Sequence, residues 1–508
     1  MATQHQPLDV FSTSHLQKDL KGRSLRGGLV TLSSQGIQFA LQSVSTIVLA
    51  HLLLPADFGL VAMVTAITGL AWALADLGLS EATIQHPEIN HDQVSTLFWI
   101  NVGIGLLLAG VTASLAPVLA AFYHEPRLKA ITLVVSLTWV ISGLRVQHSA
   151  LLQRNMRYVA MAVRDVSSYV VAVPVAIILA LRGAGYWAIV ALPLMLNGTG
   201  LILTWAMVRW IPGLPRRHAQ VRSLISFGGN VAVSYLAINI TRSADNVLIG
   251  WYWGASPLGL YSRAINLLFL PVRQVGAPAR SVAVPTFSRL QHDPEQMGRF
   301  YLRLVNIIVW ITAPIFSFLF VAATPVIILT LGSRWRAAGP VFQILAIFAL
   351  GQLLYETLTW FLISRGQSRR LLKLVMIICP IAIGSYAIGL PFGIRGVALS
   401  GTLVMLAIFP WILKFSFHGT TLTLRRLGSR IMYPTAVSLG GVVSGELVSR
   451  VTGNLSPIEQ ILLIGVAYVA GSAVLLLVKP IRDELRELLK LLPSSRMSLS
   501  ERLAGELD

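Results

Sequence analysis

The chain has 508 residues, of which 55% are hydrophobic and only 12% are charged, and its mean hydropathy is +0.71. A soluble protein of this size would carry roughly 25% charged residues, so the composition excludes a soluble globular fold and predicts a membrane protein. The net charge of +19 would suggest nucleic-acid binding in a soluble protein, but here it fits Lys and Arg collected on the loops at one membrane face.

Fourteen apolar stretches are long enough to cross a bilayer, since a transmembrane helix needs about 20 apolar residues. The first 25 residues are polar, so no cleavable signal peptide is expected. The sequence therefore predicts an all-α polytopic membrane protein. In chain order the stretches are 27–52, 58–79, 95–122, 129–151, 162–181, 185–208, 224–252, 258–288, 301–325, 338–363, 371–390, 394–416, 432–449 and 458–478.

Basic residues predict the orientation of these stretches. With fourteen spans both termini lie on one side, and that side receives 27 of the 40 Lys and Arg residues, whereas the other receives 7. Because basic loops stay on the cytoplasmic side, both termini are expected to be cytoplasmic. All the loops are short, so a working site must lie among the helices.

A faint internal repeat divides the chain. The turn Leu54–Leu60 resembles Gly254–Leu260 at an offset of 200, and Gln85–Glu88 resembles Gln291–Glu295 at an offset of 206. Repeats of this kind are common in transporters. The predicted organisation is a cytoplasmic segment (1–26), two six-helix bundles (27–208 and 222–417), two further transmembrane helices (432–478) and a cytoplasmic amphipathic tail (479–508).

Charged side chains inside the spans need polar surroundings, because each would cost roughly 2.5–3.5 kcal/mol when facing lipid. Arg242 and Asp245 are three residues apart on one helical face. They form either a structural ion pair or a functional pair, in which Arg242 is a charge of the cavity and Asp245 is the partner that modulates it. Asn239 extends the same polar stripe.

A matching polar stripe lies on the first span, with glutamines at Gln35, Gln38 and Gln42. Facing each other, these amides and the Arg242 guanidinium would suit sugar hydroxyls and phosphate. Hydrogen bonding between helices is the competing interpretation.

The stretch 258–288 is the most unusual. Prolines recur every seven residues in it, and Arg273 and Arg280 each follow a proline by two residues, with Arg263 nearer the outer end. No acidic residue lies on this stretch, so a row of arginines is available to an anionic ligand. Glu356, deep in its span, and Asp76 are the candidates for ion coupling, although a locally paired glutamate fits Glu356 equally well.

No catalytic signature is present. The single cysteine, Cys379, excludes an internal disulfide, and there is no metal-ligand cluster or phosphate-binding glycine loop. An enzyme, a resident cofactor and an ATP-driven pump are therefore not expected.

Five further motifs are informative: Asp76–Ser80, Leu151–Tyr158, Ala244–Gly250, Leu258–Ala264 and Pro285–Gln291. They resemble those of Wzx-type polysaccharide flippases, in particular the WzxC-like, colanic acid exporter-like branch of the MATE-like MOP superfamily. The resemblance covers about residues 15–420.

This resemblance implies two six-helix bundles plus two helices, as in MATE and MurJ-type proteins, around a cationic cavity. It implies translocation of undecaprenyl-diphosphate-linked oligosaccharides across the bacterial inner membrane for exopolysaccharide, capsule or O-antigen synthesis. The diphosphate would meet Arg242, Arg263 and Arg273, and a polysaccharide polymerase and a chain-length regulator are the implied partners.

Three alternatives compete with this interpretation. A MATE-type multidrug/cation antiporter would need an acidic, aromatic cavity, whereas the charges here are mostly arginines. A polymerase or ligase would need a large outside loop, and the sequence has none. A lipid II flippase shares the chemistry and is separated only by the family motifs.

Overall fold

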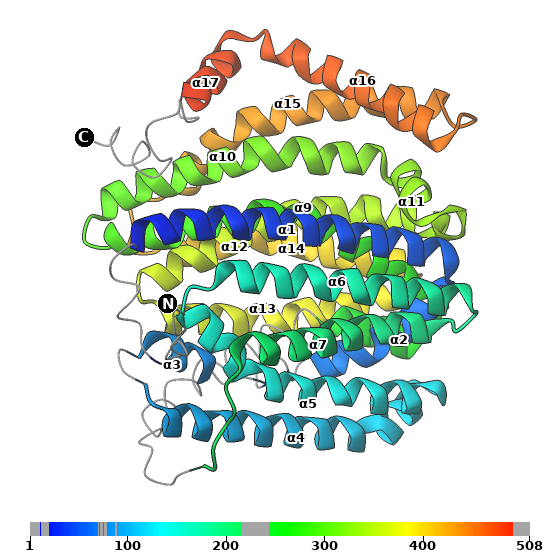
Figure 1. The fold of residues 1–508 in the computed structure, drawn as a ribbon. Coiled ribbons are helices and arrows are strands. Elements are labelled where there is room, and N and C mark those ends of the chain that lie inside the picture. Colours follow the sequence, from blue (N-terminus) through cyan, green and yellow to red (C-terminus); the bar gives the residue numbers. More distant parts are fainter. Residues whose placement is uncertain are drawn as a thin grey trace, which may run out of the picture. The chain divides into compact units, whose positions relative to one another are not determined.

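The structure is a computed structural model that describes residues 11, 20–69, 71, 75, 79–86, 89–215 and 243–490. Within these residues every regular element is a helix (Figure 1). Residues 243–253 are helical as well. The elements are α1 (Leu20–Leu52), α2 (Pro55–Thr68), α3 (Leu79–Gln85), α4 (His91–Phe122), α5 (Arg127–Arg154), α6 (Tyr158–Leu181), α7 (Tyr186–Val208), α9 (Ala255–Arg289), α10 (Pro294–Val321), α11 (Ala323–Leu331), η3 (Ser333–Ala338), α12 (Gly339–Ser364), α13 (Ser368–Gly389), η4 (Leu390–Phe392), α14 (Gly393–Phe417), α15 (Leu424–Val451), α16 (Pro457–Leu476) and α17 (Lys479–Lys490).

These helices confirm an all-α polytopic fold. Nine segments of the described chain are long and apolar enough to cross a membrane, and one of them, Ser368–Phe417, contains both α13 and α14. The long helices α1 and α9 coincide with the predicted stretches 27–52 and 258–288, although neither is among the nine. The predicted stretch 224–252 lies largely outside the described residues, so the number fourteen stays a prediction.

The chain divides into two compact units, Met1–Gly259 and Leu260–Asp508. In the first unit α4 packs along α5, while α6 packs against both α1 and α7. In the second unit α10 packs against α12 and α15, α14 packs against α12 and α13, and α15 pairs with α16.

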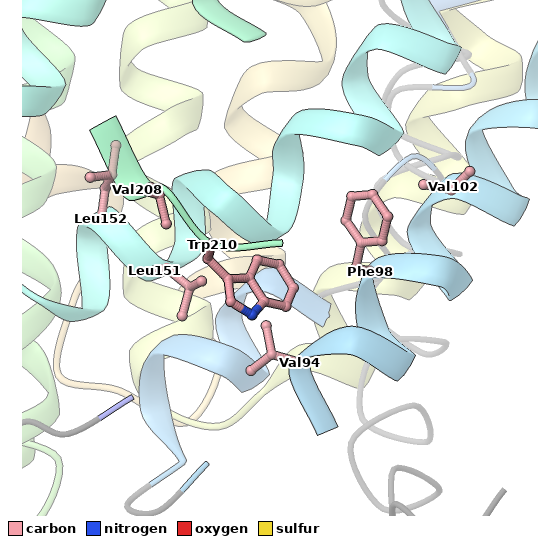
Figure 2. Packing of buried hydrophobic residues seen from close by; sticks show 7 residues of the cluster. All are labelled: Val94, Phe98, Val102, Leu151, Leu152, Val208 and Trp210. Carbon is pink, nitrogen blue, oxygen red and sulfur yellow. The ribbon is translucent and has the colours of Figure 1, made fainter. Parts of the chain in front are cut away.

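A cluster of buried apolar residues packs together within the first unit (Figure 2). Val94 and Phe98 of α4, Leu151 of α5 and Val208 of α7 surround the indole of Trp210, which follows α7. The Trp210 indole N–H lies 3.1 Å from Nδ1 of His91, at the start of α4. The segment after α7 is thereby held against α4 and α5.

The two segments that form the predicted repeat touch each other inside the first unit. A Cβ atom on Gly59 of α2 would overlap the carbonyl oxygen of Ala255, and a Cβ atom on Gly259 of α9 would overlap that of Pro55. Only glycine allows two backbones to approach this closely. Both positions therefore require glycine, because the first turns of α2 and α9 cross at this point.

Candidate functional site

The candidate site is centred on α9, which runs unbroken from Ala255 to Arg289 through Pro271, Pro278 and Pro285. Each proline removes one backbone hydrogen bond and crowds the preceding turn. Because the spacing is seven residues, these local faults fall on one face, and the remaining ladder continues the helix.

Aromatic side chains fix the end of α9 within the second unit. Phe287 of α9 meets Phe300 of α10 and Phe361 of α12, with ring centroids 5.2 and 5.6 Å apart. Tyr301 of α10 completes the cluster at 5.1 Å from the Phe361 ring. Since these rings are almost fully buried, they hold α9 firmly beside α10 and α12.

Two predicted arginines, Arg273 and Arg280, are exposed on this helix. Being seven residues apart, they lie on one face and are separated by roughly 10 Å along the axis. In the described part of the chain no carboxylate lies within 4.0 Å of either guanidinium. Arg263 differs from them, because it is half-buried and interacts with its surroundings.

Glu356 of α12 approaches the same helix. Its Oε2 lies 3.6 Å from the place where a Cβ atom on Gly276 would stand. Gly276 is buried and falls between Arg273 and Arg280 in the sequence, close to the face that they share. Glu356 is half-buried and already interacts with its neighbours. The structure thus brings the predicted acid to the arginine-bearing helix without an ion pair to the two exposed arginines.

The glutamine stripe lies on α1, in the first unit. Gln35 and Gln42 are exposed, whereas Gln38 is half-buried and donates a hydrogen bond of 2.8 Å to the Ser34 hydroxyl. Two amides are therefore available for polar contacts, and the third is engaged within α1.

Of the remaining predicted site residues, Asp245 is described by the structure and three others are not. Asp245 is buried, and its Oδ1 accepts a hydrogen bond of 2.7 Å from the backbone N–H of Asn246. Arg242, Asn239 and Asp76 lie outside the described residues. The Arg242–Asp245 pair and the polar stripe through Asn239 stay predictions.

Arg145, Arg164 and Asp165 form a charge cluster in the first unit that was not among the predicted site residues. Nε of Arg164 on α6 pairs with Asp165 at 2.7 Å, and its Nη1 donates to the Ser149 hydroxyl at 3.2 Å. Arg145 of α5 interacts electrostatically with both charged residues, and its Nη1 occupies the space that a side chain on Gly200 would need. The predicted stretch 162–181 begins four residues later than α6, which starts at Tyr158.

Arg154 was also missed, although it lies in one of the five motifs. Its Nη1 donates hydrogen bonds to the carbonyls of Thr83, Ile84 and His86, at 3.1, 3.4 and 2.5 Å. These carbonyls end α3, where no backbone donors remain to satisfy them. The buried guanidinium therefore fixes the end of α3 against α5.

Comparison with known proteins identifies the family to which the chain is similar. A family model described as "Polysaccharide biosynthesis protein" matches residues 48–340. Teichuronic acid biosynthesis protein TuaB of Bacillus subtilis is 25% identical over 303 residues, which are 59% of this chain and 63% of TuaB. Succinoglycan biosynthesis transport protein ExoT of Rhizobium meliloti is 29% identical over 63% of this chain and 65% of ExoT. The chain thus spans just under two thirds of these two relatives. Lipopolysaccharide biosynthesis protein WzxC of Escherichia coli is 24% identical over 84% of this chain and 90% of WzxC.

Solved structures share the fold. The lipid II flippase MurJ, in an inward closed conformation, matches with a TM-score of 0.69 at 14% identity, over 90% of this chain and all of MurJ. An inward-facing multidrug resistance MATE transporter of the MOP superfamily matches with a TM-score of 0.58 at 16% identity, over 76% of this chain and 98% of that one. The predicted MATE and MurJ-like fold is confirmed.

Proposed function

Because this chain belongs to the family of polysaccharide biosynthesis proteins, we propose that it is a flippase for undecaprenyl-diphosphate-linked oligosaccharide repeat units. It moves them across the bacterial inner membrane, with both of its termini in the cytoplasm, to supply exopolysaccharide, capsule or O-antigen synthesis. It works by alternating access, without catalysing a chemical reaction, and it hands its product to a polysaccharide polymerase and a chain-length regulator.

One observation carries this proposal: two exposed arginines on α9 that have no carboxylate partner among the described residues. Their spacing of roughly 10 Å lets two long side chains converge on one diphosphate. Guanidinium groups bind phosphate oxygens in a bidentate manner, and each such charged hydrogen bond contributes about 1.5–3 kcal/mol. Arg273 and Arg280 would hold the diphosphate.

Other residues would serve the rest of the substrate and the driving force. The exposed amides of Gln35 and Gln42 offer donors and acceptors that suit sugar hydroxyls. In this proposal Arg242, Asn239, Asp245 and the Arg263 guanidinium also belong to the cationic cavity.

For ion coupling, Glu356 is the stronger candidate and Asp76 the weaker. The supporting contact is the approach of the Glu356 carboxylate to α9 at Gly276. A carboxylate at this place changes the local charge of the arginine face when it gains or loses a proton.

The alternatives have less support. The MATE and MurJ likenesses show the fold alone, so they do not decide the substrate. A drug/cation antiporter needs negative charge where its cation binds, whereas α9 exposes positive charge. The family match and the relatives named for polysaccharide synthesis favour a polysaccharide precursor over lipid II.

The test replaces Arg273 and Arg280 by alanine, singly and together, in cells that depend on this chain for surface polysaccharide. We expect the double variant to reduce export at least about tenfold, because it removes charged contacts of about 1.4 kcal/mol or more. The membrane level of each variant is measured by immunoblot, and export is measured as polysaccharide on the cell surface.

Arg289→Ala is the matched control, because Arg289 is exposed on the same helix but about 180° from Arg280. It should export normally. Normal export by the double alanine variant, at a normal membrane level, would exclude the proposed diphosphate contact. Replacement of both arginines by lysine should restore export only in part, since lysine keeps the charge but not the bidentate geometry.

A further inference from the structure

The last described helix, α17, is amphipathic and docked on the second unit. Its apolar positions include Ile481, Leu485 and Leu488, and Ile481 is only 5% exposed. On the same side of the helix as Leu488, Glu484 accepts a hydrogen bond of 2.6 Å from the Asn306 amide of α10. These contacts hold one side of α17 against protein.

The other side of α17 carries a row of basic residues beside the exposed acids Asp483 and Glu487. Lys479, Arg482 and Arg486 are spaced three and four residues apart, so they form one stripe. All three are exposed, and none has an ion-pair partner among the residues that the structure describes. Their charge is therefore open to a ligand outside the chain.

The first turns of α15 add basic residues at the same end of the second unit. In the α15–α16 pair Gly440 lies against Leu475, and Gly445 lies against Ile464, so the two helices are antiparallel. The start of α15 therefore lies near the junction of α16 with α17. It carries the exposed residues Arg425, Arg426 and Arg430, which together with Lys479, Arg482 and Arg486 we call the basic collar.

The collar begins where the lipid-facing surface ends. The outward side chains of α16 are apolar from Leu462 to Val474, and Leu477 directly after it is 74% exposed. An apolar surface of this kind on a membrane span contacts acyl chains. Lys479 follows two residues later, so we expect it at the depth of the phospholipid headgroups.

We propose that the basic collar binds the headgroups of anionic phospholipids in the surrounding bilayer. Basic amphipathic helices beside a transmembrane segment attract anionic lipid, and docking of α17 keeps its stripe at the membrane surface. The same basic residues could serve only to orient the chain in the membrane, since basic segments stay on the cytoplasmic side. That role requires no preference for one lipid over another. The proposal does not depend on the transported substrate.

The experiment measures how strongly spin-labelled phosphatidylglycerol and spin-labelled phosphatidylcholine associate with the purified full-length protein in vesicles, by electron spin resonance. We expect phosphatidylglycerol to associate about fivefold or more strongly. In the triple variant Lys479→Gln, Arg482→Gln, Arg486→Gln this preference should fall to about half of the wild-type value or less, because half of the collar's charge is removed. Raising the salt to molar concentration should weaken the wild-type preference, because the contacts are exposed.

The matched control neutralises three exposed arginines that are outside the collar, as Arg334→Gln, Arg336→Gln, Arg395→Gln. It removes the same charge and should keep the preference. The variant Arg482→Lys, Arg486→Lys should keep it too, and circular dichroism verifies helix content in each protein. Equal association of the two lipids with the wild type, or equal losses in the triple variant and its control, would overturn the proposal.

Discussion

Arg164 of α6 and the pair Arg273 and Arg280 of α9 all interrupt apolar helices, but they differ in exposure and in their partners. Arg164 is paired with Asp165, its side chain is only 11% exposed, and Ser149 takes one of its remaining donors. Arg273 and Arg280 are exposed and have no carboxylate within 4.0 Å in the described chain.

Under the proposed function, this difference separates structural charges from charges that bind the substrate. Enclosed charges contribute by satisfying one another, and removal of one partner leaves the other uncompensated. Exposed charges contribute little to folding and stay available for binding. Mutation should therefore lower stability at the enclosed sites and change binding at the open ones.

The largest loss of stability is expected at Arg154, which is enclosed like Arg164. Arg154→Ala leaves the carbonyls of Thr83, Ile84 and His86 without their donor. Thr83 is buried and loses its charged donor outright, whereas water can reach the half-buried Ile84 and the exposed His86, so the free energy of unfolding should fall by about 1.5–3 kcal/mol. Thermal unfolding of the purified protein in detergent measures this. An unchanged midpoint would contradict the role assigned to Arg154.

A smaller loss is expected from Asp165→Asn. The substitution keeps the shape but leaves Arg164 and Arg145 without the carboxylate that they share. Asp165 is 35% exposed, so water compensates in part, and we expect a decrease of about 1–3 kcal/mol in the same unfolding assay. The double variant Arg145→Gln, Asp165→Asn should recover part of this loss, whereas additive losses would argue against a shared site.

Substitution of the open arginines should hardly affect stability. We expect Arg273→Gln with Arg280→Gln to change the free energy of unfolding by less than about 0.5 kcal/mol, as for ordinary surface sites. Inorganic pyrophosphate, as a probe of the site, should raise the unfolding midpoint of the wild type and not that of the double variant, because ligands stabilise the state that binds them. A large fall in stability would place these arginines in the enclosed class.

A small, pH-dependent effect concerns Glu125, in the turn between α4 and α5. Two hydrogen bonds of 2.8 Å from Arg127 lower the pKa of the Glu125 carboxyl below its ordinary value of 4.5. The resulting stabilisation is complete above that value and is lost as the pH falls through the lowered pKa. Because Arg127 is 52% exposed, the stabilisation from this pair should stay below about 1 kcal/mol. Glu125→Gln should remove this part of the acid sensitivity in unfolding curves recorded between neutral and acidic pH.

The sequence predicted the helices well where long apolar runs determine them. The stretches 185–208 and 394–416 agree with α7 and α14 to within a residue or two at each end. It also predicted that Arg273 and Arg280 share one helix face, because the seven-residue spacing that signals a face needs no tertiary information.

Tertiary contacts account for what the sequence could not show. Gln38 and Gln35 belong to one stripe, but only the structure shows that the Gln38 amide is already bonded to Ser34. Similarly, nothing near Arg154 in the sequence reveals the carbonyls of α3 that it binds, since they lie about 70 residues earlier. Helix faces follow from periodicity, whereas the partner of a polar group depends on packing.

The glycine crossing has a consequence for the origin of the chain. Pro55 faces Gly259 and Ala255 faces Gly59, and both members of each equivalent pair are 200 residues apart. Reciprocal contact of the same two positions is the mark of an isologous interface, the kind that joins two identical subunits about a twofold axis. Duplication of one shorter segment would account for both the offset of 200 residues and the reciprocal contact.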